Sequence, residues 1–583
     1  MMRHRSRAHA LAICLLASAA FAQPDSPAKP SENEKPKEPK EDGIAVTSKL
    51  VVSRCGACHK QDDKGAMTRI SFVRTTPEGW ELAIKRMIRL NGVTLSPDEA
   101  RAILKYLSTY HGLAPEEAKP VLYIAEHRMI DEKEPNDYVR GACMICHPLG
   151  RAMSWRRSKE EWALLANMHV GYFPVVEFQG FRREPPQPDA PPPAPGTDTR
   201  DPVERAAEYF AKTYPLQTPE WAAWRARMRA TKLAGRWLVS GRQTGRGRIW
   251  GEMLIEPGSA EDEFTTNITL HYIKDGKTEQ RTGRALVYTG HAWRGRSHPT
   301  SGPDPEQMRE VMMVSPDQSQ MEGRWFWGAY EEFGIDVTLR RAANEPAVLA
   351  TDRTALRSGA NSERVRIFGD NLPSGLQPAD FDLGSGVTVQ RVVSQEGNQA
   401  TVEVNVAANA VVGTRDVAIR RAVLPNAIAV FDKIDYIKVI PETPLARLGG
   451  GSHPKGYQQF EAVAYNRGLD GKPNTADDVD LGPVDAQWSI EEFLAVYGDD
   501  DKDFVGTLSP TGFFTPAEEG PNPKRKFGRN NYGDVWVVAT YQPKGDEIRE
   551  PKAGEVAKPM TGRAYLIVAV PLYVKWDQPE VAQ

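Results

Sequence analysis

The chain of 583 residues is too long for a single hydrophobic core and predicts roughly three to five domains. Its hydrophobic content of 40% and charged content of 26% are those of an ordinary soluble globular protein. A formal net charge of -3 gives no electrostatic basis for binding nucleic acid or an anionic membrane surface.

The first residues have the pattern of a secretory signal peptide. Basic residues precede an apolar run from Ala8 to Ala19, and Ala20-Phe21-Ala22 supplies a small-residue cleavage site. We therefore predict a signal peptide over 1–22 and a mature protein in the periplasm. No later apolar segment has the length of a membrane span, so no membrane insertion is expected. Residues 23–43, rich in Pro, Glu, Lys and Ser, predict a disordered linker.

Two copies of the pattern C-x-x-C-H follow, Cys55-Gly56-Ala57-Cys58-His59 and Cys143-Met144-Ile145-Cys146-His147. Each is typical of covalent c-type haem attachment, because the two thiols can add to the vinyl groups of one porphyrin and the next imidazole can ligate the iron. A zinc knuckle or a thioredoxin-like redox pair is the alternative for C-x-x-C alone. The repeated histidine and the lack of a further cysteine pair favour two covalently bound haems c.

The remaining cysteine count limits the chemistry of the chain. Of five cysteines, Cys14 lies in the signal peptide and the other four belong to the two motifs. None is left for a disulfide, a zinc site or a catalytic thiol. Any cofactor that needs another protein cysteine must therefore reside on a different chain.

Helical patterns surround both motifs, and residues 44–183 predict an all-α dihaem cytochrome c domain. Thr76-Pro77 opens a helix that stops at Asn91-Gly92, and Ser96-Pro97-Asp98-Glu99 forms a capping box. A second capping box, Ser158 with Glu161, opens a helix that ends near Gly171 and Pro174.

The two motif segments form a degenerate internal repeat that suggests the remaining iron ligands. Trp80 precedes Met87 by the same spacing as Trp162 precedes His169, so each pair shares a helix face. With His59 and His147 on the proximal sides, the repeat predicts one His59/Met87 haem and one His147/His169 haem of different potential.

Other assignments of these residues stay open. Met87 can simply pack in a core beside Ile84, and His169 can be a surface residue at a helix end. The competing axial ligands are Met67, Met153, Met168, His111 and His127. Of these, Met67 and Met153 follow closely behind the motifs and are expected to pack against the porphyrin faces.

The rest of the chain predicts all-β domains. Short alternating runs split by turns, such as Phe264–Tyr272 and Asp336–Leu339, indicate a barrel, and Val365–Gly369 with Ala400–Val406 indicate an Ig-like sandwich. The expected boundaries are a Pro-rich linker over 184–200, a β-barrel domain over 201–343, an Ig-like β-sandwich over 344–440 and a second one over 441–583. Two Asp-rich loops, around Asp470–Asp480 and Asp499–Asp503, match no EF-hand spacing and are interpreted as solvated loops, although calcium binding stays open.

With both motifs and the β-rich remainder, the chain resembles the alpha subunit of quinohemoprotein amine dehydrogenase. The resemblance extends over nearly all of the mature chain. Its most distinctive segments are Gly369-Asp370-Asn371-Leu372-Pro373, Ala446-Arg447-Leu448-Gly449-Gly450, Trp488-Ser489-Ile490-Glu491-Glu492-Phe493, Gly512-Phe513-Phe514-Thr515-Pro516, Gly520-Pro521-Asn522-Pro523 and Asn530-Asn531-Tyr532-Gly533-Asp534-Val535-Trp536.

The resemblance implies a periplasmic heterotrimer with a propeller-like beta subunit and a small gamma subunit that carries cysteine tryptophylquinone and oxidises a primary amine to an aldehyde and ammonia. The alpha subunit would pass the electrons to a soluble cytochrome c or a blue copper protein. The charged linker and the Pro-rich insert depart from the family pattern. A stand-alone dihaem enzyme of peroxidase type and a monomeric electron carrier are the alternatives.

Overall fold

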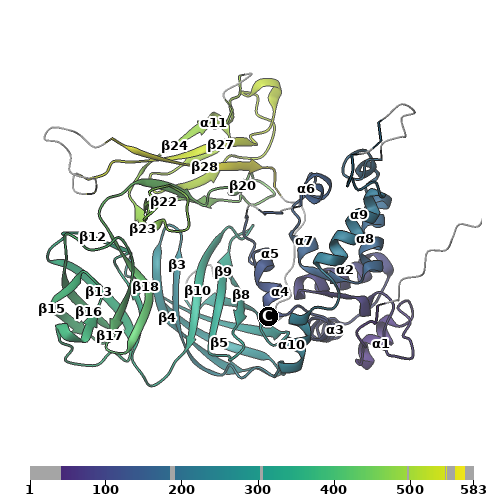
Figure 1. Cartoon of the computed structure of the whole chain (residues 1–583), viewed down its shortest axis with the longest axis horizontal. Helices are drawn as coiled ribbons and strands as arrows, with labels where there is room; N and C mark the ends of the chain where they lie inside the picture. Colours follow the sequence, from purple (N-terminus) through teal and green to yellow (C-terminus); the bar gives the residue numbers. More distant parts are fainter. Residues whose placement is uncertain are drawn as a thin grey trace, which may run out of the picture. The chain divides into compact units, whose positions relative to one another are not determined.

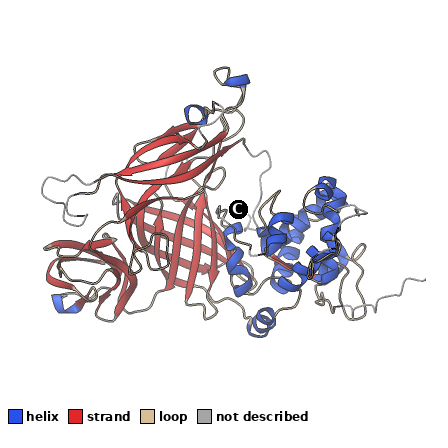
Figure 2. Cartoon of the chain, turned by 45° about the horizontal axis from the view of Figure 1, so that its top comes forward, coloured by secondary structure: helices blue, strands red, loops and turns tan. Residues whose placement is uncertain are grey.

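The computed structural model describes residues 41–130, 132–134, 136–183, 191–192, 194–301, 306–494, 498–544, 547 and 558–571. The predicted signal peptide, nearly all of the linker over 23–43 and part of the Pro-rich segment lie outside the described residues. Gly43–Gln583 forms one compact unit. Most helices come early in the chain and most strands after them (Figure 1), and most helices lie apart from the strands (Figure 2). None of the helices within the described ranges is both long and apolar enough to cross a bilayer.

The part of the chain that holds the two C-x-x-C-H motifs is mainly helical. Its helices are α1 (Lys49–Cys55), α2 (Pro77–Asn91), α3 (Pro97–Tyr110), α4 (Pro115–Ala118), α5 (Leu122–Ala125), α6 (Asp137–Cys143), α7 (Gly150–Met153), α8 (Lys159–Tyr172), α9 (Pro202–Thr213) and α10 (Pro219–Arg227), with 3-10 turns η1 (Ile70–Phe72), η2 (Lys119–Val121) and η3 (Pro174–Phe178).

Local capping signals determine where these helices begin. Thr76 caps α2, which ends at a left-handed Gly92, and Ser96 forms a complete capping box with Glu99 on α3. Both predictions are confirmed. At α8 the Ser158 hydroxyl accepts the amide hydrogen bond of Glu161 at 3.3 Å, whereas the Glu161 side chain contacts Arg69. The second capping box is therefore only half formed.

The prediction of an all-α domain is wrong, because a two-stranded antiparallel sheet joins the two motif segments. Strand β1 (Val73–Thr75) pairs with β2 (Trp155–Arg157), and Arg74 lies opposite Arg156. The two arginines are equivalent in the repeat, since each lies two residues before a helix cap. Strands of three residues carry no detectable periodicity, so only the pairing between repeats reveals them.

The internal repeat extends into α9. The Trp80 indole donates to the His111 carbonyl at the end of α3 (2.8 Å), and the Trp162 indole donates to the Tyr214 carbonyl at the end of α9 (3.0 Å). Trp162 also stacks on Phe210 of α9 at 5.0 Å. Helix α9 thus belongs to the core of the second repeat, although the sequence alone grouped it with the barrel.

The predicted barrel is confirmed as eight antiparallel strands that close between the last and the first. The strands are β3 (Gly235–Gln243), β4 (Gly247–Pro257), β5 (Glu263–Tyr272), β6 (Thr278–Tyr288), β7 (Ala292–Pro299), β8 (Met308–Val314), β9 (Gln320–Trp327) and β10 (Phe333–Arg341). Alternate side chains of these strands fill the interior, among them Trp237, Trp293 and Trp325.

Two further β regions follow, each with its own core. The first packs the sheet β11 (Ala347–Thr351), β13 (Glu363–Asp370), β16 (Gln399–Val406), β15 (Val387–Glu396) against β12 (Ala355–Arg357), β18 (Ala422–Phe431), β17 (Gly413–Ile419), β14 (Phe381–Asp382). The second contains β19 (Tyr436–Ile440), β22 (Glu461–Asn466), β23 (Val479–Val484); β20 (Leu445–Arg447), β28 (Met560–Ala569), β27 (Gly533–Tyr541), β24 (Gln487–Glu492); β21 (Gln458–Gln459), β26 (Phe513–Pro516), β25 (Gly506–Leu508); and α11 (Asp501–Phe504).

Buried polar contacts fix the first motif segment to the barrel at the β6–β7 turn. The Thr289 hydroxyl donates to the Ser108 carbonyl at 2.6 Å, and His291 Nε2 lies 3.0 Å from the Leu113 carbonyl. Lys105 forms an ion pair with Asp262 at 2.7 Å. His291 is buried, and its burial lowers its pKa to about 4.

Because His291 is buried in this interface, we predict that the protein loses stability in mild acid. The folded pKa of His291 lies below the ordinary value of about 6.5, so the unfolded chain takes up the proton first. Stability is therefore complete above pH 6.5 and falls as the pH approaches 4. His291→Gln, which keeps a donor for Leu113 but cannot be protonated, should reduce the fall between pH 7 and 4.5 by about 2–3 kcal/mol. Urea unfolding at both pH values measures this. If the free energy of unfolding fell equally in the variant and the unsubstituted protein, the prediction would be wrong.

Candidate haem sites

The first motif begins at the end of helix α1. The amide groups of Cys58 and His59 donate to the Cys55 carbonyl at 3.3 and 2.9 Å, which turns the chain back on itself. Cys55 is half-buried against the core, Cys58 is exposed and both thiols are free. His59 Nδ1 lies 2.8 Å from the Thr68 carbonyl. A carbonyl only accepts, so Nδ1 carries the proton and Nε2 is left for a metal.

The second motif also begins at the end of a helix, α6. Cys143 is half-buried, Cys146 is exposed, and both thiols are again free. His147 Nδ1 lies 2.8 Å from the Pro148 carbonyl, which leaves its Nε2 for a metal in the same way. Burial raises the pKa of the Cys143 thiol to about 11.

The imidazole rings of His147 and His169 lie close to each other. Their ring centres are 6.4 Å apart and the rings are inclined by 30°. His169 Nδ1 lies 2.9 Å from the Leu165 carbonyl within helix α8, so Nδ1 is the donor and Nε2 is left for a metal. Imidazole nitrogens bind metals at about 2 Å, so two imidazoles on one metal have centres roughly 6 Å apart. The residues present therefore fit a metal held from both sides.

The surroundings of this pair are apolar although they are exposed. Helix α8 and turn η3 present Met168, Tyr172, Phe173, Val175 and Phe178, and Phe178 is 79% exposed. Phe173 lies 6.4 Å from the His169 ring. Such a cluster on a soluble protein normally meets a ligand or partner. Its apolar character fits the face and edge of a porphyrin.

Met87 lies on α2, the helix that passes the first motif. Ile84, one turn earlier on the same helix, packs against the cluster that contains Cys55 and Trp80. Met87 is half-buried and is followed by the exposed Ile88. Ile84 and Cys55 therefore pack against the same core cluster.

The competing ligands occupy other environments. Met67 and His111 are completely buried, and burial lowers the pKa of His111 to about 3. His127 is paired with Glu331 of the barrel. Met153 is half-buried beside two core clusters, and Met168 is exposed near His169. Both ring nitrogens of His111 are buried without a hydrogen-bond partner, and its ring lies edge-on to Trp80 at 6.1 Å.

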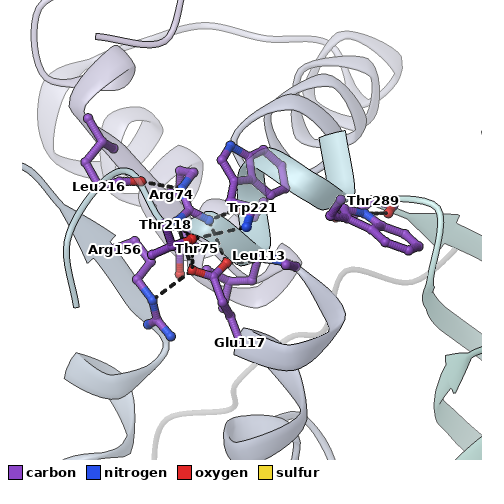
Figure 3. Close-up of polar contacts among 12 residues, drawn as sticks. Arg74, Thr75, Leu113, Glu117, Arg156, Leu216, Thr218, Trp221 and Thr289 are labelled. Carbon is purple, nitrogen blue, oxygen red and sulfur yellow. Dashed lines mark hydrogen bonds and ion pairs between the residues drawn. The ribbon is translucent and has the colours of Figure 1, made fainter. Parts of the chain in front are cut away.

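A buried carboxylate links the two repeats at the β1–β2 junction (Figure 3). Glu117 accepts two hydrogen bonds from Arg74, at 2.7 and 2.9 Å, and one from Arg156 at 3.2 Å. The Thr218 hydroxyl donates to the same carboxylate at 2.8 Å. Arg74 reaches further to the Leu216 carbonyl at 2.7 Å. One carboxylate therefore binds both repeats and the segment before α10.

Because this cluster is buried, each of its charged side chains depends on its partners of opposite charge. The Arg74 side chain is completely buried and the Glu117 side chain is 5% exposed. Burial alone would raise the pKa of Glu117, but the hydrogen bonds and charge of Arg74, with the charge of Arg156, outweigh it and hold the pKa below its usual range. Glu117 could not be singled out from the sequence, where the only signal was that Arg74 and Arg156 are equivalent in the repeat.

The Asp-rich loops are engaged with protein groups. Asp499, Asp500 and Asp501 lie close enough together to hold a metal ion, yet Arg525 and Arg529 both contact Asp500. In the other loop, the Asp477 carboxylate accepts from the Leu469 amide at 2.7 Å. Carboxylates of both loops are thus bound to groups of the protein itself.

Comparisons with known proteins give one consistent family. Four protein-family models match: Quinohemoprotein amine dehydrogenase A, alpha subunit, haem binding, over 45–186; alpha subunit domain II over 230–342; domain III over 345–432; and domain IV over 437–581. No curated protein matches the sequence.

Similar solved structures include a redesigned beta barrel, at 16% identity over 19% of this chain and 92% of that chain, with a TM-score of 0.17. Human Protocadherin-24 EC1-2 matches at 10% identity over 39% of this chain and 96% of that chain, with a TM-score of 0.15.

Removing the Glu117 charge should destabilise the joined repeats. Glu117→Gln leaves buried arginines without their carboxylate, so we expect the free energy of unfolding to fall by about 3 kcal/mol or more. Glu116→Gln is the matched control, because its ion pair with Arg227 is about half exposed, and should cost less than about 1 kcal/mol. Urea unfolding followed by circular dichroism measures both; equal effects would contradict the assignment.

Proposed function

The chain belongs to the quinohemoprotein amine dehydrogenase alpha-subunit family and contains its haem-binding domain, and on this premise we propose that it is the dihaem electron-transfer subunit of a periplasmic amine dehydrogenase. It would relay electrons from a quinone cofactor on a partner subunit, where a primary amine becomes an aldehyde and ammonia. The acceptor would be a soluble cytochrome c or a blue copper protein.

The residues that would hold the two haems c are those of the repeat. Cys55 and Cys58 would attach the first haem and Cys143 and Cys146 the second. His59 with Met87, and His147 with His169, would be the axial ligands of the two irons. The observation that carries the proposal is the 6.4 Å separation of the His147 and His169 rings, with both Nδ1 atoms directed at carbonyl oxygens.

Each bound haem supplies a one-electron iron couple, and the protein groups determine its potential. Hydrogen bonds from Nδ1 of His59 and His147 fix the ring orientation and raise the basicity of Nε2. A thioether from Met87 would raise the potential of the first haem relative to the second. If His147 and His169 both held one iron, as proposed, that haem would have no ligand position left for a substrate, whereas a peroxidase-like enzyme would need one.

The partners follow from the family and from the cysteines. The quinone is expected to be cysteine tryptophylquinone on a small gamma subunit, because the cysteines of this chain after residue 22 all lie in haem motifs. A propeller-like beta subunit would complete the heterotrimer. We propose Ig-like sandwiches over 344–440 and 441–583 that hold these subunits, and export through a signal peptide over 1–22. A monomeric carrier would instead purify without partners.

Met87→Ala tests the first axial pair. Loss of the thioether should lower the reduction potential of one haem and remove any Fe–S charge-transfer absorption, because sulfur ligation favours the reduced iron. Spectroelectrochemistry of the purified holoprotein measures both. An unchanged spectrum and potential would reject Met87 as the ligand.

His169→Ala tests the second pair. One haem should become high-spin, since His147 alone would then hold its iron, while the other stays low-spin. Electron paramagnetic resonance of the oxidised protein distinguishes these states. Two low-spin centres in the variant would exclude His169, and cyanide binding to the unsubstituted protein would favour the peroxidase-like alternative.

A further inference from the structure

The chain after the first motif contains a strained turn. The Ile70 amide donates to the Thr68 carbonyl at 2.8 Å, and Arg69 between them has φ 68° and ψ -56°. This is a γ-turn of the rare form with positive φ, a conformation that is unfavourable for any residue with a Cβ. Such a turn persists only where surrounding contacts hold it.

The carbonyl group of this turn is the one that contacts the first motif histidine. His59 Nδ1 donates to the Thr68 oxygen at 2.8 Å, so this oxygen accepts from both His59 and Ile70. The direction of the Thr68 carbonyl depends on the torsion angles at Arg69. The strained turn therefore determines where the hydrogen-bond acceptor of His59 lies.

Helix α8 of the second repeat holds the turn from the other side. Glu161 Oε1 forms an ion pair with Arg69 Nε at 2.9 Å, and the Ser158 amide donates to the Phe72 carbonyl at 3.1 Å. The Glu161 side chain is 5% exposed, and its second oxygen lies 3.7 Å from Arg157. These two contacts bracket η1, which follows the turn. Glu161 stands at the capping-box position of α8 but is directed at Arg69.

The second motif is built differently. His147 donates to the carbonyl of Pro148, its own neighbour in the chain. The residue that corresponds to Glu161 in the first repeat is Gly79, which has no side chain to offer. The contact thus runs in one direction, from the second repeat to the first.

We propose that Glu161 is a positioning residue for His59: through its ion pair with Arg69 it holds the γ-turn that aims the Thr68 carbonyl at His59. This inference rests on the proposed function, in which His59 ligates the first iron. A firm Nδ1 hydrogen bond makes an imidazole a stronger donor and lowers the potential of its iron. Helix α8, which also carries His169, thereby tunes the other haem.

Glu161→Ala should relax the turn, weaken the His59 hydrogen bond and raise the midpoint potential of the first haem only. Glycine adopts positive φ without steric cost. The double variant Glu161→Ala/Arg69→Gly should therefore keep the turn and return the potential toward that of the unsubstituted protein, whereas Glu161→Ala/Arg69→Ala should stay shifted. Glu160→Ala, at the exposed neighbouring position, is the matched control and should shift nothing.

The measurement is a redox titration of each purified holoprotein, with circular dichroism to establish that the variants are folded. The first haem is the one that stays low-spin in His169→Ala. No shift in Glu161→Ala, or equal shifts in the two double variants, would overturn the inference while two haems remain bound. Fewer than two bound haems in the unsubstituted chain would instead reject the proposed function.

Discussion

The arrangement of the helical region depends on one buried ion cluster, Glu117 with Arg74 and Arg156. The internal repeat brings two equivalent arginines face to face in the β1–β2 pairing. Two guanidinium groups on directly paired residues of a buried sheet repel each other, so the pairing requires a carboxylate close to both. Glu117 comes from outside both strands, and its negative charge offsets much of this repulsion. A duplicated unit can therefore join its own copy only because a third segment supplies the opposite charge.

The same cluster connects the joined repeats to the rest of the chain. Arg74 and Glu117 bind Leu216 and Thr218 in the segment before α10, and Trp224 of α10 donates to the Thr289 carbonyl in the β6–β7 turn at 2.9 Å. These hydrogen bonds connect the β1–β2 junction to the barrel. Electron transfer between two haems depends on their separation and orientation, and a fixed junction of this kind suits the proposed relay better than a flexible linker would.

The sequence was sufficient for features that depend on local chemistry. Thr76 and Gly92 located both ends of α2, the Ser96–Glu99 box located the start of α3, and alternating runs such as Phe264–Tyr272 indicated the barrel. It was insufficient where distant segments meet. Strands β1 and β2 are too short to show a hydrophobic pattern. Glu117 acquires its role only when both repeats are folded. Glu161 matched a helix-capping pattern in the sequence, but in the structure its side chain contacts Arg69 instead. Haem-motif residues were found because their chemistry fixes their spacing.

The central claim is that this polypeptide holds two porphyrins, each with its iron bound by side chains on both sides, and acts as an electron conductor. Pyridine haemochrome analysis of the purified mature protein tests it most directly. The account predicts two covalently attached haems per chain. A value of one or none would contradict it.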